Sequence, residues 1–208
     1  MSYYRRSQTP GAAYFFTVNT YRRQRILTHP DVMDALRTAL CDVRLQDPFK
    51  IDAMVVLPDH LHAIWTLPPG DAHFAIRWSI IKRKVSQAAR HLVDQTHSAS
   101  RERRREIDFW QRRYWEHQIR DDADFGRHVD YVHYNPVKHG HVDRVRDWPY
   151  STFHRYVRLG VCPPIGPVVE LMRRVVILGS ERVRIAHPTW LPFSPRTRGH
   201  KRRAHPWL

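Results

Sequence analysis

The chain has 208 residues, of which 42% are hydrophobic, enough for one domain with a buried core and a tail. Its 35 lysines and arginines against 20 acidic residues give a net charge of +15, which favours a polyanionic partner, nucleic acid ahead of a membrane surface. No segment approaches the roughly 18 apolar residues of a membrane span, and the N-terminus has no apolar signal-peptide region, so we expect a cytoplasmic protein. Two cysteines exclude a cysteine-rich zinc module.

The first half of the chain predicts three strands and a helix. Residues 12–21 are rich in aromatic and β-branched side chains, which is typical of a strand. Apolar residues recur at helical spacing over residues 30–46 and predict an amphipathic helix. Residues 49–58 and 60–68 predict two further strands, which a short turn joins into a hairpin.

The second half predicts two helices, a strand and a basic tail. A helix over about residues 72–93 carries a basic face, which either contacts a phosphate backbone or is simply solvated, the default for such a face. The next residues predict a flexible loop and then an aromatic-rich strand. Acidic residues begin a third helix, which we expect to stop at Pro136. We therefore divide the chain into a domain at 1–158 and a Pro- and Arg-rich tail at 159–208.

Two histidines flank a single leucine in the third predicted strand. Side chains alternate between the two faces of a strand, so His60 and His62 share one face while Leu61 points into the core. Two imidazoles side by side form half of a metal site. In a chain with 15 histidines, a pair of ordinary surface histidines is the open alternative.

The third helix could complete this site. Its apolar stripe must face the sheet and consists of Phe125, Val129 and Val132. The same helical spacing groups three polar or aromatic side chains on the flank of that stripe: His128, Tyr131 and Asn135. Tyr131 and Asn135 are four residues apart and therefore neighbours, so the helix could offer a phenol and an amide oxygen to the histidine face. The alternatives are a half-buried aromatic for Tyr131 and an ordinary helix-end residue for Asn135.

This set of groups suits attack on a phosphodiester. Two neutral imidazoles and an amide oxygen would hold a divalent ion that polarises the phosphate, and a tyrosine could attack it to form a phosphotyrosine. The ester would be exchanged and not hydrolysed. A 3′ hydroxyl could therefore reverse the step and rejoin DNA without ATP.

Three stretches in this order carry a resemblance to a known family: "PDHLHAIWTLP", "RYWEHQIRDDADFGRHVDYVHYNPVKHG" and "DWPYSTFHRYV". They resemble the REP-associated tyrosine transposases, relatives of the single-tyrosine HUH transposases, in which two histidines flank a hydrophobic residue. The segments "YRR" at residues 4–6 and "YFFTVNTY" are also similar to that family. The resemblance covers about residues 3–158.

The resemblance implies a fold, a site and a cofactor. The fold would be an α+β ferredoxin-like sandwich, a central antiparallel sheet with helices packed on one face, followed here by the basic C-terminal extension. Tyr131 would be the nucleophile, and His60, His62 and Asn135 would hold the divalent metal, Mg²⁺ or Mn²⁺. Asp59 is left out of the site because sheet parity directs it away from the metal.

The partner that the resemblance implies is hairpin or single-stranded DNA of the REP type, with no small-molecule substrate and no membrane. Residues of the family's N-terminal motif would grip the single-stranded foot of the hairpin: Tyr4, Arg5 and Arg6. The basic face of the second helix adds further candidate phosphate contacts: Arg77, Lys82, Arg83 and Lys84. Aromatic residues could stack on unpaired bases, although we favour packing for the last two: Tyr3, Tyr4, Tyr114, Trp110 and Trp115.

Two other functions remain open from the sequence. One is a rolling-circle replication initiator or relaxase, which shares the histidine pair and a tyrosine but usually carries a third nearby histidine or two tyrosines and a partner domain. The other is a domesticated protein that binds REP hairpins without cutting them. The working form could be a monomer or a dimer.

Overall fold

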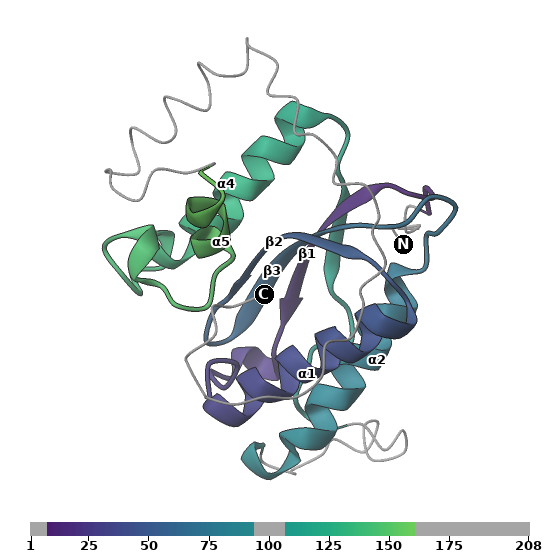
Figure 1. Cartoon of the computed structure of the whole chain (residues 1–208). Coiled ribbons are helices and arrows are strands. Elements are labelled where there is room, and N and C mark those ends of the chain that lie inside the picture. The colour runs from purple at the N-terminus through teal and green to yellow at the C-terminus, as the bar shows by residue number, and fades with distance from the viewer. Residues whose placement is uncertain (1–7, 94–106, 161–208) are drawn as a thin grey trace, which may run out of the picture.

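The computed structural model describes residues 8–93 and 107–160 (Figure 1). A four-stranded sheet lies at its centre, built from β1 (Ala13–Asn19), β2 (Lys50–Val56), β3 (His60–Thr66) and β4 (Trp115–Gln118). The strand order is β2-β3-β1-β4, and every pair of neighbours is antiparallel. With one helix between β1 and β2 and another between β3 and β4, this is the predicted ferredoxin-like α+β arrangement.

The first helix, α1 (Pro30–Gln46), has the predicted boundaries. Pro30 suits the first helical turn because its missing N–H would have no partner there, and the side chain of His29 accepts a hydrogen bond from the Asp31 N–H. The predicted hairpin is also confirmed. Its turn is closed by a hydrogen bond of 2.8 Å from the Leu57 N–H to the His60 carbonyl.

One face of the sheet is covered by α1 and α2 (Phe74–Ala88), which lie side by side (Figure 1). The inward residues of β1 on this face are apolar and fully buried: Tyr14, Phe16 and Val18. The indoles of Trp65 on β3 and Trp78 on α2 stack with ring centroids 4.1 Å apart. These contacts fix α2 on the sheet, although it is shorter than the predicted span of about 72–93.

The opposite face carries α4 (Asp122–Lys138), and the short α5 (Phe153–Arg158) contacts the edge strand β2, where the Tyr156 hydroxyl donates to the Asp52 carbonyl at 3.0 Å (Figure 1). The expectation that all helices pack on one face was therefore wrong. The reason lies in β2 and β3, whose side chains are buried on both faces, so both faces need a cover. Val129 and Val132 supply it from α4, packing on Phe15 and Val55 of the sheet.

The helix α4 passes through Pro136 and ends at Lys138, contrary to the stop predicted at the proline. A proline removes one helical hydrogen bond, here the one to the Val132 carbonyl, but the loss falls in the last turn. The following N–H groups close that turn, with His139 donating to the Asn135 carbonyl at 3.0 Å and His141 to the Pro136 carbonyl at 2.9 Å.

Three short 3-10 turns complete the described fold: η1 (Tyr21–Arg23), η2 (Arg90–Leu92) and η3 (Val145–Asp147). Within residues 8–93 and 107–160, no helix has the length and apolar character that crossing a membrane requires. Most of the predicted loop at 94–108 and nearly all of the tail lie outside the described residues.

Candidate active site

The predicted histidine pair lies on the α4 face of the sheet. His60 and His62 stand at the first and third positions of β3, and only 4% and 3% of their surfaces are exposed. Their ring centroids are 4.9 Å apart. The pair is therefore buried in the interior and does not consist of the ordinary surface histidines that the sequence left open.

Each imidazole is held through its Nδ1 atom. His60 Nδ1 lies 2.7 Å from Asp59 Oδ1, and His62 Nδ1 lies 2.9 Å from the hydroxyl of Thr17 on β1. When Nδ1 donates these hydrogen bonds, Nε2 of each ring is left with a free lone pair. This is the arrangement in which an outer partner orients a metal-binding histidine.

Asp59 has a different position from the one we expected. It lies in the turn before β3, so strand alternation does not apply to it, and its carboxylate contacts His60 and lies 2.9 Å from Arg23 Nε. Burial alone would raise the pKa of this carboxyl group, but the hydrogen bond with His60 and the charge of Arg23 lower it. Asp59 therefore supports the site as an anion that orients His60.

Both imidazoles are neutral at physiological pH. Burial lowers the pKa of His60 in spite of the neighbouring Asp59 carboxylate. Burial and the adjacent His60 hold the pKa of His62 well below its ordinary value. Since only a neutral imidazole has a lone pair to give, both rings are in the state that a metal ligand needs.

The flank of α4 faces the histidine pair. The Tyr131 ring lies 5.1 Å from the His62 ring, and the His139 ring lies 5.3 Å from the His60 ring, measured between centroids. Asn135 is one helical turn from each of these two residues and so lies on the same side of the helix. The ring contact places Tyr131 at the histidine face, and helical spacing puts the fully buried Asn135 on the same side of α4.

Three buried polar atoms on this face have no partner among the described residues: His62 Nε2, Asn135 Oδ1 and Asn135 Nδ2. Asn135 is fully buried, and an unpaired polar group in such a place is costly. An ion bound by the imidazole nitrogens and the amide oxygen would use two of these atoms. The donor set fits a divalent cation.

The two tyrosines of the helix differ in their surroundings. Tyr131 is 37% exposed and makes edge contacts with both His62 and Phe15, and the Lys138 ammonium lies 4.8 Å from its ring centroid. For Tyr134 the described part of the chain offers no such ring contact with either histidine.

The predicted DNA-binding residues fall into three groups. Tyr4, Arg5 and Arg6 lie outside the described residues. Arg83 is exposed on α2, while the Lys82 ammonium reaches the Gln111 carbonyl at 2.6 Å and Lys84 pairs with Asp42 at 2.6 Å. Because α2 covers the face opposite to α4, these three residues are remote from the histidine pair.

The prediction that Arg77 binds DNA was wrong, because the residue is only 3% exposed and cannot contact a phosphate. Its guanidinium is engaged by the Asp71 carboxylate and donates to the carbonyls of Asp47 at 3.0 Å and Pro48 at 3.1 Å. It ties the start of α2 to the end of α1. The residue looked like part of a basic helix face because helical spacing does not show which charges already have partners.

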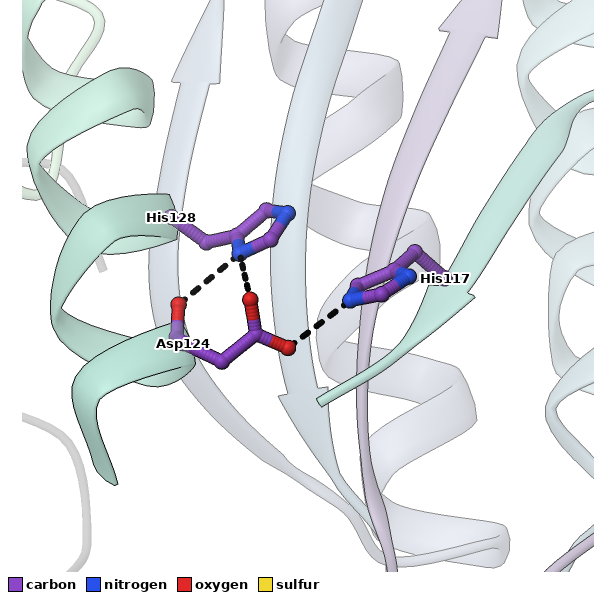
Figure 2. Close-up of side chains that lie close together, drawn as sticks. All are labelled: His117, Asp124 and His128. Atoms are coloured by element: carbon purple, nitrogen blue, oxygen red, sulfur yellow. Dashed lines mark hydrogen bonds and ion pairs between the residues drawn. The ribbon is translucent and has the colours of Figure 1, made fainter. Parts of the chain in front are cut away.

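A second cluster lies at the start of α4 and was not predicted (Figure 2). Ligand atoms of His117 on β4 and of Asp124 and His128 on α4 lie within 4.8 Å of one another, close enough for one metal ion to reach all three. The spacing of Asp124 and His128, four residues apart on a helix, was the available signal. No sequence pattern links either of them to His117.

The contacts of the second cluster satisfy it without an ion. Asp124 Oδ2 lies 2.8 Å from His117 Nε2 and 3.2 Å from the backbone N–H nitrogen of Arg120, and Oδ1 lies 3.2 Å from Arg127 Nη2. His128 Nδ1 lies 2.8 Å from the Asp124 carbonyl oxygen. In contrast to the pair on β3, these groups hold β4 and α4 together.

Replacing Asp124 by asparagine is expected to destabilise the fold by about 1–3 kcal/mol at pH 7, because a buried charged acceptor of several hydrogen bonds is lost. Burial opposes ionisation, but hydrogen bonds from His117 and Arg120 keep the pKa of the carboxyl group below its ordinary range. The stabilisation is therefore present above about pH 4 and declines as the pH falls further. Urea unfolding at pH 7 and pH 3 measures the free energy of unfolding of the unaltered protein and of Asp124→Asn. The difference between these two free energies should be smaller at pH 3. Asp122→Asn, an exposed neighbour, is the control, and equal stability of all three proteins would contradict this role.

Comparisons with known proteins assign the chain to a family. Residues 9–135 match the family model described as "Transposase IS200 like". A REP-associated tyrosine transposase of Escherichia coli (strain K12) is 46% identical over 164 residues, which cover 78% of this chain and 89% of that protein. The chain is an IS200-like transposase. Within that family, it belongs with the REP-associated tyrosine transposases.

Two further relatives of this transposase support the assignment. A protein of Haemophilus influenzae (strain ATCC 51907 / DSM 11121 / KW20 / Rd) is 43% identical over 166 residues, 78% of this chain and 92% of that protein. A solved structure of a REP-associated tyrosine transposase bound to a REP hairpin superimposes with a TM-score of 0.68 at 44% identity. That match covers 81% of this transposase and 93% of the solved chain.

Proposed function

We propose that this transposase binds REP-type hairpin DNA and cuts and rejoins the single strand beside it through a 5′-phosphotyrosine on Tyr131. The observation that supports the proposal is that the exposed phenol of Tyr131 lies next to a buried, neutral histidine pair. The Tyr131 and His62 rings are 5.1 Å apart, and His62 Nε2 and the Asn135 amide have no partner among the described residues.

The residues that would hold a divalent ion, Mg²⁺ or Mn²⁺, are His60, His62 and Asn135. When bound, such an ion polarises the scissile phosphate and neutralises charge on the leaving oxygen. Asp59 and Thr17 would support these ligands, because they contact the two imidazoles through Nδ1 and so leave Nε2 of each ring available for an ion. The cluster around Asp124 has a structural role in this proposal.

The chemical step belongs to Tyr131. Its phenol oxygen loses its proton and attacks the phosphorus, which forms the tyrosine–phosphate bond as the bond from phosphorus to the 3′ oxygen breaks. The departing 3′ oxygen takes up a proton. The DNA is left with a free 3′ hydroxyl and a 5′ phosphate on the enzyme, and the reverse attack by a 3′ hydroxyl rejoins the strand.

The proposed substrate rests on the solved relative and on charge. That relative, 44% identical to this chain, is bound to a REP hairpin. The net charge of +15 suits a polyanion. We propose Tyr4, Arg5 and Arg6 as contacts to the single-stranded foot, and the exposed Arg83 with Lys82 and Lys84 as contacts to more distant phosphates. Arg77 is withdrawn because it is buried in contacts of its own.

The test is an incubation of the protein with labelled single-stranded hairpin DNA, with Mg²⁺ or with EDTA, followed by a denaturing gel. We expect a covalent protein–DNA adduct and a cut strand with Mg²⁺ and neither with EDTA. Tight binding without any adduct would identify a domesticated hairpin-binding protein instead. A full yield in EDTA would exclude the metal site.

A further inference from the structure

An exposed tryptophan lies close to the proposed nucleophile. Trp115, the first residue of β4, is 53% exposed. Among the phenylalanine, tyrosine and tryptophan residues in 8–93 and 107–160, only Trp115 and Tyr131 are exposed; the others are buried or half-buried. The packing that we favoured from the sequence holds for Trp110, which is 5% exposed, but fails for Trp115.

The strand register places Trp115 on the face that carries the active site. Thr17 of β1 pairs with Trp115 on one side and with His62 on the other. Directly paired residues of neighbouring strands point to the same face, so the three side chains form one row across the sheet. Two strand spacings, about 10 Å, separate Trp115 from His62, above which Tyr131 lies.

The orientation of the Trp115 ring is fixed by its neighbours. It is stacked on His117 with an interplanar angle of 5°, and His117 is stacked in turn on His128 at 17°. Asp124 holds His117 by a contact of 2.8 Å, drawn in Figure 2. The Phe15 and Trp115 rings form a T-shaped pair with centroids 5.7 Å apart, so these contacts fix the indole while Trp115 stays 53% exposed.

Exposed arginines precede and follow this tryptophan in the chain. Arg112 and Arg113, shortly before it in the chain, are exposed. Arg120 and Arg127 pair with Asp124, the residue that also contacts His117, and their side chains are 69% and 62% exposed. A flat aromatic surface among cations is the combination that proteins use to bind single-stranded nucleic acid.

We propose that Trp115 is the stacking platform for one unpaired base of the strand that carries the scissile phosphate. An unpaired base can place its face on the indole, whereas the bases inside the hairpin stem are already stacked on each other. Stacking would pin the strand about 10 Å from His62 and so help to place the phosphate beneath Tyr131. The inference rests on the proposed function, because it takes a single strand at this site as given.

The test uses 2-aminopurine, a fluorescent base whose emission falls when it stacks, placed in turn at each position of the single-stranded flank. Binding is measured in the Tyr131→Phe background to prevent cleavage. With Trp115 intact, we expect quenching at one position of the flank. Trp115→Ala should lose this quenching and bind the flanked hairpin about tenfold more weakly. Trp115→Phe should largely keep both the quenching and the affinity. A blunt hairpin without the flank should bind all variants equally. Ile76→Ala, which removes an apolar side chain that is 55% exposed on the opposite face, should change neither measurement.

Three results would overturn the inference. They are unchanged quenching in Trp115→Ala, no quenching at any position, and an equal loss of affinity for the flanked and blunt hairpins. A thermal melt of Trp115→Ala confirms that it is folded. The adduct assay with intact Tyr131 reports separately on the proposed function. An adduct without quenching refutes only the platform, and quenching without an adduct refutes only the chemistry.

Discussion

Tyr131→Phe is expected to bind hairpin DNA as tightly as the unaltered protein and to form no covalent adduct. The substitution removes only the phenol oxygen, which is the attacking atom, and leaves the ring contacts with His62 and Phe15. Loss of a nucleophile costs at least about 10³-fold in rate, so cleavage should fall below detection. Denaturing gels and a hairpin-binding titration measure the two effects. An adduct formed by Tyr131→Phe would assign the attack to another residue.

Tyr134→Phe is the matched control for this experiment. The two tyrosines are three residues apart on one helix, so their side chains point in directions about 60° apart. Tyr131 shares its side of the helix with Asn135, and an attacking atom must come within about 3–3.5 Å of the phosphorus. Tyr134→Phe should therefore keep the adduct. Its loss in this variant, with binding intact, would contradict the helix-face argument.

His62→Ala is expected to abolish cleavage and to weaken Mn²⁺ binding by at least about 100-fold. Removing a residue that orients a ligand typically lowers metal affinity about 10–100-fold, and removing the ligand itself should lower it more. Hairpin binding in EDTA should be unchanged, since we assign it to basic groups elsewhere. Calorimetry or electron paramagnetic resonance of Mn²⁺ measures the affinity without reference to activity. Asn135→Ala should behave in the same way. Unchanged Mn²⁺ affinity in both variants would exclude the site.

Three further substitutions extend this test. Thr17→Val removes the hydroxyl that holds His62 Nδ1 and should weaken Mn²⁺ binding by about 10–100-fold without abolishing it. His91→Ala alters a histidine that is 58% exposed on the other side of the sheet, where it pairs with Asp31, and should change nothing. His117→Ala separates the two clusters, because it should leave Mn²⁺ binding intact if the second cluster holds no ion.

Much of the site could be predicted because it depends on two simple periodicities. Strand alternation placed His60 and His62 on one face, and helical spacing placed Tyr131 and Asn135 on one side of α4. Both conclusions use only residues within one element. Strand alternation failed for Asp59 because that residue belongs to the turn, where side-chain direction is set by hydrogen bonds and not by alternation.

The rest depended on contacts between elements that are distant in the sequence. The burial of Arg77 is caused by Asp71 and by carbonyls at the end of α1, which no helical pattern reveals. The cluster around Asp124 joins a strand to a helix, and the exposure of Trp115 follows from its place on the edge strand β4. Aromatic composition alone predicted packing there. The second face of the sheet could have been inferred from the almost unbroken apolar run of β2.

The most direct test of the proposed chemistry is the identity of the residue that becomes linked to DNA. The unaltered protein is incubated with hairpin DNA and Mg²⁺, the DNA is digested to a short remnant, and the tryptic peptides are sequenced by mass spectrometry. We predict a nucleotide linked through its 5′ phosphate to Tyr131. A nucleotide on Tyr134 or on any other residue, or a complete cut with no modified peptide, would contradict the proposal.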